Sequence, residues 1–352
     1  MDAHPVFGPD EHEPWRRLAR EVSVKFSFLM CSERSGSNLI TRMLDAHSAI
    51  CGPATKHLIN PVARNAFRYE PLERPANWQA LLEDIHALLN AEFSHWRTSF
   101  SLDDLAGLAK PGDLPMLIRR VFAAEAEAHG KSVVFVKENQ VYEFIAFLLL
   151  HFPEATYVYQ VRDPRDMALS WKNNPGHPGG VCRAARQWQA DQQNSLKLYS
   201  ELHRLGRARL IYYEQLISEP EKVLTDVLGM MGLAYEPAML SYHESELTRA
   251  NAGQQHAWSN LDKAVMTDNS QKYRDALSAD EIRAIESICY SEMQHLGYRC
   301  EFDKPELDRF AKEELARFEE ADTRTKAHAQ PASVKANVEA KKRFYQRLPI
   351  KT

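Results

Sequence analysis

Four short segments of the chain carry the apolar pattern of strands. β-Branched and aromatic residues are concentrated, or alternate with polar ones, over residues 22–30, 131–138, 155–163 and 208–214. Between these segments, apolar residues recur at the three- and four-residue spacing of helices, as they do after Asn38. Strands that alternate with helices predict an α/β fold, in which a mostly parallel sheet is flanked by helices on both faces.

The remaining apolar periodicity is helical. Residues 60–130 are interrupted by prolines, and we expect them to form a helical insertion whose clearest helices cover 77–93 and 114–130. Further helices are predicted over 141–152, 179–206, 219–232 and 278–297. Ser278 and Glu281 have the spacing of a capping box at the start of the last of these helices.

The pattern divides the chain into three parts. We expect a loose lead-in over residues 1–20, one α/β domain over 21–302 and a charged C-terminal extension over 303–352. In the extension, the sequence predicts one charged helix over 304–330 and a basic, proline-broken end over 340–352.

Composition narrows the function classes. The 352 residues have a formal net charge of −4, so no basic excess favours nucleic acid as a partner. The five cysteines are scattered without a CxxC pair and the histidines lack metal-ligand spacing, so a metal site is disfavoured. Scattered cysteines also predict reduced thiols in a cytoplasmic protein. The N-terminus does not resemble a signal peptide, and the longest apolar run, 144–152, is too short for a membrane span.

A tight polar loop over residues 32–38 follows the first predicted strand and precedes a predicted helix. The nucleoside-triphosphate loop G-x-x-x-x-G-K-[ST] is not matched, because its first glycine and its lysine–hydroxyl pair are missing. Gly36 still lets the backbone approach an anion, and the N–H groups of a helix N-terminus point toward negative charge. Arg34 can add paired hydrogen bonds to phosphate oxygens. The loop predicts an anion site; the alternative is a polar turn with an exposed arginine.

A second polar segment follows the third predicted strand. Arg162 stands at the end of that strand, and Ser170 follows about two helical turns later. An arginine and a hydroxyl on neighbouring elements suit a second phosphate, while Asp163 and Asp166 are expected to support the helix start and orient the arginines. Because ligands of parallel sheets bind beyond the carboxyl ends of the strands, we expect the loops after Met30, Val136, Val161 and Tyr213 to line one cleft.

With both segments in place, the chain resembles the sulfotransferases that use 3′-phosphoadenosine 5′-phosphosulfate (PAPS), and it is most similar to their bacterial and tyrosylprotein-type branch. The resemblance covers about residues 25–299 and implies a P-loop-type fold. It assigns the 5′-phosphosulfate to the loop residues Arg34, Ser35, Gly36, Ser37 and Asn38. It assigns the 3′-phosphate to Arg162 with Ser170, the adenine side of the nucleotide to Tyr213 and a further nucleotide contact to Lys263.

The catalytic base stays open. Tyrosylprotein-type enzymes carry glutamates directly after a Cys-Gly pair, where this chain has Pro53 and Ala54. His57 lies in the same loop, and its usual pKa of about 6.5 suits a base. Glu138 ends the second predicted strand and serves instead if burial raises its pKa, and a third residue remains an option. His47, nearer the end of the first helix, is expected to cap that helix.

Two lysines compete to stabilise the sulfuryl oxygens together with Arg34. Lys137 matches the family's lysine after the second strand, and Lys56 is the other candidate. The Gly/Pro-rich loop over 174–181, which contains His177, is either a lid over the acceptor or a connection.

The resemblance implies transfer of a sulfuryl group from PAPS to an acceptor hydroxyl or amine, with release of 3′-phosphoadenosine 5′-phosphate (PAP) and no requirement for a metal. The acceptor is a small molecule, a carbohydrate or a peptide, and a homo-oligomer is one option for the assembly. Two other functions stay open: a nucleotide kinase-like enzyme that uses ATP, and a non-catalytic PAP- or nucleotide-binding protein of the same fold.

Overall fold

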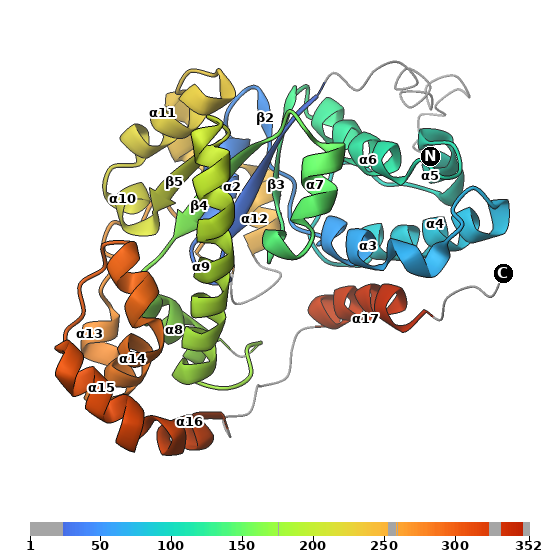
Figure 1. Cartoon of the computed structure of the whole chain (residues 1–352). Helices are drawn as coiled ribbons and strands as arrows, with labels where there is room; N and C mark the ends of the chain where they lie inside the picture. The colour runs from blue at the N-terminus through green and yellow to red at the C-terminus, as the bar shows by residue number, and fades with distance from the viewer. Residues whose placement is uncertain (1–23, 175, 253–257, 259, 324–331, 348–352) are drawn as a thin grey trace, which may run out of the picture.

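The computed structural model describes residues 24–174, 176–252, 258, 260–323 and 332–347 (Figure 1). The expected lead-in over 1–20 and the last five residues of the basic end lie outside this part of the chain.

A five-stranded sheet forms the centre of the fold. Its strands are β1 (Lys25–Cys31), β2 (Ile50–Cys51), β3 (Val133–Lys137), β4 (Thr156–Val161) and β5 (Ala208–Tyr212). They stand in the order β2-β3-β1-β4-β5, and every pair is parallel. The prediction of a mostly parallel α/β sheet is confirmed, although the two-residue edge strand β2 was not expected because so short a strand leaves no apolar pattern.

Alternate side chains of the central strand β1 enter two separate cores. Phe28 belongs to the larger core, which also contains side chains of α6 (Leu114–Ala128), α9 (Val181–Arg204) and α14 (Ala279–His295). Leu29 belongs to the smaller core, which is shared with α2 (Ser37–Asp45) and α11 (Pro220–Met231). A sheet buried on both faces requires apolar residues at successive positions, which explains the near-continuous apolar run of β1.

Shorter helices complete the two layers. The insertion over residues 60–130 consists of α6 and of α3 (Ile59–Asn65), η1 (Ala66–Tyr69), α4 (Pro75–Leu89) and α5 (Leu102–Leu108). Around the remaining strands lie η2 (Val141–Glu143), α7 (Ile145–His151), α8 (Pro164–Lys172), α10 (Tyr213–Ser218), η3 (Pro237–Glu244), α12 (Glu246–Ala252) and α13 (Tyr273–Ala276). The predicted capping box is present, since Ser278 accepts the N–H of Glu281 and Glu281 accepts that of Ser278.

The C-terminal extension is more helical than its sequence pattern predicts. Instead of one charged helix, it forms α15 (Lys304–Glu313) and α16 (Leu315–Thr323), which are separated at Glu314. A third helix, α17 (Ala332–Gln346), occupies the part expected to be a basic, broken end. Figure 1 shows α15 and α16 beside α14, whereas α17 lies beneath α3 and α4 on the other side of the molecule.

Among the described residues, no helix combines the length and the apolar character that crossing a bilayer requires.

Candidate active site

The loop between β1 and α2 is held by its own hydrogen bonds and by β4. The Ser35 hydroxyl donates to the carbonyl of Ser32 at 2.7 Å, and the Gln160 amide donates to the carbonyl of Ser35 at 2.9 Å. Gly36 has a φ of +88°, and a Cβ there would lie 2.3 Å from the ring of Tyr213. Both the conformation and the close approach require glycine. The Ser35 hydroxyl thus stabilises the loop itself.

A cavity of about 310 Å³, which we call the Arg162 cavity, opens on one side of this loop. Its lining includes Arg34, Gly36, Ser37, Asn38, Arg162, Ser170 and Tyr213. These residues come from the loop, the end of β4, α8 and the start of α10, at the carboxyl ends of the strands. The expected single cleft is only partly formed here, because the residues after Val136 do not line this cavity.

The two arginines of this cavity lie close together, and Asp166 lines the same cavity. Arg162 stacks over the ring of Tyr213 at 4.3 Å and donates to the carbonyls of Arg34 and Asn269 at 3.1 and 3.2 Å. Its Nε is buried and has no hydrogen-bond partner among the described residues. Arg34 donates to the Ser170 hydroxyl at 3.1 Å. Burial and the charge of Arg162 lower the pKa of Arg34 to about 10, which marks a site where an anion would be stabilised.

The acidic residues of the second segment hold the surroundings of the cavity in place, and Asp166 itself lines it. Asp163 binds Arg165, which is buried and also paired with Glu286 at 2.6 Å. Asp166 accepts the backbone N–H groups of Gln271 and Tyr273, and so holds the chain around residue 272 beside the cavity. The expectation that these two aspartates act as supports agrees with these contacts.

Lys272, which the sequence analysis did not select, lines the Arg162 cavity. Lys263, which was expected to contact the nucleotide, does not line it. Lys263 is exposed, and its ammonium donates to Asn260 at 2.9 Å. A lysine in an irregular segment offers no periodicity from which its direction could be read, so a choice between these two needed the fold.

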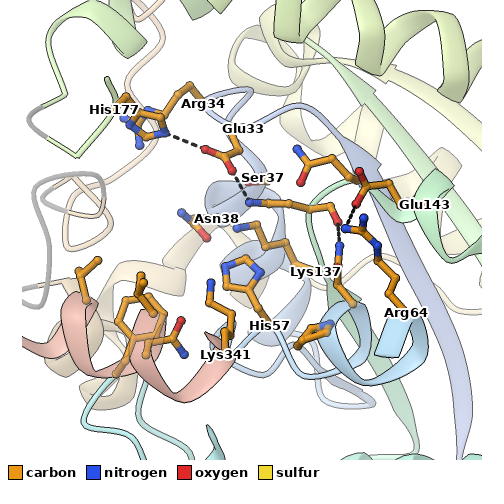
Figure 2. Close-up of a pocket in the computed structure, with 18 of the residues that line it drawn as sticks. Glu33, Arg34, Ser37, Asn38, His57, Arg64, Lys137, Glu143, His177 and Lys341 are labelled. Atoms are coloured by element: carbon orange, nitrogen blue, oxygen red, sulfur yellow. Dashed lines mark hydrogen bonds and ion pairs between the residues drawn. The ribbon is translucent and has the colours of Figure 1, made fainter. Parts of the chain in front are cut away.

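A second cavity, of about 340 Å³, lies on the other side of the loop, and we call it the His57 cavity (Figure 2). Arg34, Ser37 and Asn38 line both cavities. The two cavities therefore meet at the start of α2.

His57 faces this cavity, and Glu138 lies behind it. His57 has a φ of +55°, and its Nδ1 is 3.6 Å from Glu138 Oε2. Glu138 is 2% exposed and does not line the His57 cavity. Its Oε1 accepts the N–H of Ile59 at 2.9 Å, whereas Oε2 has no hydrogen-bond partner within the part of the chain that the structure describes. Of the two expected bases, only His57 is placed to touch a molecule in the cavity.

Burial shifts the pKa of both members of this pair. It raises the pKa of Glu138 to about 7. It lowers the pKa of His57 well below 6.5, and the charges of Lys341 and Lys137 lower that pKa further. The imidazole is consequently neutral at pH 7, which is the form that can accept a proton.

Of the other basic candidates, Lys137 lines the His57 cavity, whereas Lys56 and His47 bind backbone groups of the protein itself. Lys137 lines the His57 cavity, and burial lowers the pKa of its amine. Lys56 is not among the lining residues; its ammonium donates to the carbonyl of Phe93 at 2.9 Å and fastens that loop. The side chain of His47 does not cap α2 as expected: its Nδ1 accepts the N–H of Ala49, and its Nε2 lies 2.9 Å from the carbonyl of Ala234.

The loop over 174–181 contacts the phosphate loop. His177 lies 2.7 Å from Glu33 through Nε2 and lines the His57 cavity (Figure 2). The Trp171 indole donates to the carbonyl of Pro178 at 3.2 Å and packs on the His177 ring at 4.2 Å. Residue 175 lies outside the described part of the chain.

Comparison with known proteins decides the family. The model of the sulfotransferase family matches residues 28–237. The chain belongs to the sulfotransferase family. The resemblance stated from the sequence is confirmed, and with it the expectation of an enzyme of this class at the level of the family.

Individual relatives of this sulfotransferase-family chain are distant. Protein-tyrosine sulfotransferase 2 of Gallus gallus is 22% identical over 255 residues, which are 68% of this chain and 62% of that protein. An uncharacterized protein of Aquifex aeolicus is 24% identical over 230 residues, which are 62% of this chain and 27% of that protein. The chain therefore spans less than two thirds of the length of these curated relatives.

Among solved structures, the sulfotransferase domain from the curacin biosynthetic pathway has a similar fold. It has a TM-score of 0.56 and 21% identity, over 78% of this chain and 98% of that one. At this identity the likeness concerns the fold. The family match contains Arg34, His57, Glu138, Arg162 and Tyr213, but it ends before Lys272 and before α17.

Five residues of α17 line the His57 cavity, and the sequence analysis selected none of them: Val334, Asn337, Val338, Lys341 and Tyr345. A signal for this helix was present, because the buried residues Asn337, Ala340 and Phe344 recur at helical spacing. The charged residues between them concealed it. Among the described residues, no group of three or more His, Cys, Asp or Glu side chains is arranged to hold a metal ion.

Proposed function

We propose that this sulfotransferase-family chain transfers a sulfuryl group from PAPS to an acceptor hydroxyl or amine and releases PAP. The observation that carries the proposal is the meeting of two cavities at Arg34, Ser37 and Asn38. The Arg162 cavity offers cations and hydroxyls to a nucleotide diphosphate, and the His57 cavity offers a neutral base to an acceptor.

The donor fits the Arg162 cavity by charge. Arg162 and Ser170 would bind the 3′-phosphate, and Tyr213 would contact the adenine side. The backbone N–H groups at the start of α2, together with Arg34, would bind the 5′-phosphosulfate. The lowered pKa of Arg34 supports an anionic ligand, since an anion would remove the repulsion from Arg162. Lys272 is a further cation for either phosphate.

The proposed transfer step takes place where the two cavities meet, at Arg34, Ser37 and Asn38. His57 takes the proton of the acceptor hydroxyl as the acceptor oxygen bonds to sulfur. The bond between sulfur and the bridging phosphate oxygen breaks, and its electron pair leaves with PAP. Arg34 and Lys137 stabilise the charge that develops on the sulfuryl oxygens and the leaving phosphate. Glu138 orients the His57 ring and, when ionised, stabilises the imidazolium.

The volume of the His57 cavity bears on the acceptor, and the cysteines bear on the compartment. The volume of the His57 cavity suits a small-molecule acceptor. All five cysteines are unpaired, which supports a reducing compartment such as the cytoplasm.

Acceptor screening with PAPS labelled in the sulfuryl group tests the proposal, with calorimetry for PAP. We expect PAP to bind, and we expect His57→Ala to leave PAP affinity unchanged while turnover falls by about 10²–10⁴-fold. His295→Ala, at an exposed position of α14, is the matched control and should keep full turnover. Preference for ATP with Mg²⁺ over PAP would favour the kinase-like reading. PAP binding without turnover of any acceptor would favour a non-catalytic protein.

A further inference from the structure

The C-terminal helix α17 is fixed to the helical insertion by its last two turns. Phe344 is fully buried, and its ring lies 6.3 Å from that of Tyr69 on η1. Arg347, just past the end of α17, pairs with the buried carboxylate of Asp84 on α4 at 2.7 Å. Buried apolar contact and a charge-assisted bond on one helix end give α17 a defined place.

The same helix reaches the His57 cavity at its middle. Asn337 donates to the carbonyl of Lys56 at 3.2 Å, next to His57 in the chain, and Tyr345 donates to Asn60 at 3.2 Å. One turn after Asn337, Lys341 lines the cavity, and Figure 2 shows its side chain beside His57. α17 thus forms a wall of the cavity opposite the phosphate loop.

Lys341 has no partner among the described residues. Its ammonium makes no hydrogen bond or ion pair there, although its position costs it hydration and lowers its pKa. The nearest acids do not neutralise it. Glu33 already binds His177 and Asn139, both at 2.7 Å, and Glu138 lies behind the His57 ring.

The other charges of the cavity are matched or serve the donor side. Arg64 is paired with Glu143. Arg34 lines both cavities, and Lys137 ends β3, which pairs with β1 immediately before the phosphate loop. Lys341 does not line the Arg162 cavity. The charge of Lys341 is therefore not needed to stabilise the sulfuryl group. A partly desolvated cation without a counter-ion favours an anionic ligand.

Part of the lining near Lys341 is apolar. Phe93 and Trp258 lie with their rings 5.2 Å apart, and Val334 and Val338 of α17 add aliphatic surface. The cavity therefore offers a base, a cation and an apolar wall within a volume of about 340 Å³.

We propose that Lys341 selects acceptors that carry an anionic group, a carboxylate or a phosphate, besides the hydroxyl that receives the sulfuryl group. The C-terminal helix then completes the acceptor site. This inference rests on the proposed function, and Lys341 acts in it as a specificity-determining residue that binds the acceptor while His57 handles the proton.

Matched pairs of probes test it in the PAP-bound protein. 4-Hydroxybenzoate is compared with 4-hydroxybenzamide, glycolate with glycolamide, and glycerol 3-phosphate with glycerol, by calorimetry and by transfer from labelled PAPS. We expect the anionic member of at least one pair to bind more tightly by about tenfold to a hundredfold, the range of a charge-assisted hydrogen bond. Lys341→Met should remove this preference and leave PAP affinity unchanged, and Lys341→Arg should retain most of it.

Lys342→Met is the control on the same helix, since Lys342 is exposed and paired with Glu339 at 2.6 Å. It should keep the preference for the anionic probe. Equal binding of both members in every pair, no binding of any anionic probe, or a preference that survives Lys341→Met overturns the inference. Failure of wild-type protein to bind PAP would instead contradict the proposed function, so the two failures are distinguishable.

Discussion

Arg34 is the residue on which both halves of the proposed reaction depend. It has a φ of +62° and lines both cavities, and its guanidinium donates to Ser170 on α8. A left-handed backbone at a non-glycine residue is uncommon and is kept where the surroundings fix it. Here the Arg34 carbonyl accepts from Arg162. The two arginines thus position each other, and a substitution at either alters the donor site.

The first prediction concerns Arg162. Arg162→Ala should weaken PAP binding by about tenfold to a hundredfold or more, because a charge-assisted hydrogen bond contributes about 1.5–3 kcal/mol. Adenosine 5′-phosphosulfate, which lacks the 3′-phosphate, should lose much less affinity. Calorimetry with both ligands measures the difference. Arg204→Ala, at the exposed end of α9, is the control. Equal losses for both ligands would show that Arg162 does not recognise the 3′-phosphate.

The second prediction concerns pH. His57 must be neutral to accept a proton, and its pKa lies well below 6.5, so turnover should hold at neutral pH and fall only as the pH drops through that low pKa. The charged groups around the ring are Glu138, Lys137 and Lys341. Removing the positive charge with Lys341→Met should move this acid limb to higher pH. Glu138→Gln should leave the limb nearly in place, because burial raises the pKa of Glu138 to about 7 and its carboxyl is already neutral at that lower pH.

The profile of kcat/KM against pH for the wild type and both variants checks this prediction. A purely structural role of Lys341 would lower the rate without moving the limb. A limb that stays in place in Lys341→Met would therefore contradict His57 as the base.

At the scale of elements, the sequence predicted individual helices and strands but not the contacts between residues far apart in the chain. The strand–loop–helix around Gly36 was predicted from contiguous residues, but the ring of Tyr213, which makes glycine necessary there, stands 177 positions later. His57 and Glu138 were weighed as rival bases because sequence does not reveal that they touch. α17 was missed since its buried face is narrow and its partners, α3 and α4, are far away in the chain.

The third prediction tests α17 as an element. Phe344→Ala removes a fully buried ring, a change that typically costs about 3–5 kcal/mol where the helix docks. No α17 residue lines the Arg162 cavity, so PAP affinity should change by less than about twofold. The KM for an acceptor should rise more than about tenfold, because the wall that carries Lys341 loosens. Calorimetry and steady-state kinetics separate the two effects.

Phe310→Ala provides the matched control for this experiment. Phe310 is buried on α15, where it packs against Phe318 of α16. The substitution should lower the free energy of unfolding and leave the acceptor KM unchanged. A parallel loss of PAP and acceptor binding in Phe344→Ala would mean that α17 supports the whole fold and not the acceptor cavity alone.

At the scale of the whole molecule, positive charge is not in excess, but it is concentrated at one place. The chain carries a net charge of −4, yet Arg34, Arg162 and Lys272 converge on one cavity. Local convergence of this kind gives an anion site that bulk composition conceals. Under the proposed function, these side chains would supply the neutralisation that Mg²⁺ provides in nucleoside-triphosphate enzymes.

The last prediction follows from that distribution of charge. PAP at a hundredfold excess over its Kd should raise the free energy of unfolding by about 2.7 kcal/mol, because it binds the folded chain alone. The resulting rise in Tm should be the same with Mg²⁺ and with EDTA, since the counter-charge belongs to Arg34, Arg162 and Lys272. Adenosine 5′-phosphate, which lacks the 3′-phosphate, should give a smaller rise at equal concentration. Thermal melts with each ligand in both buffers measure these differences, and a rise that requires Mg²⁺ would show that the side chains do not suffice.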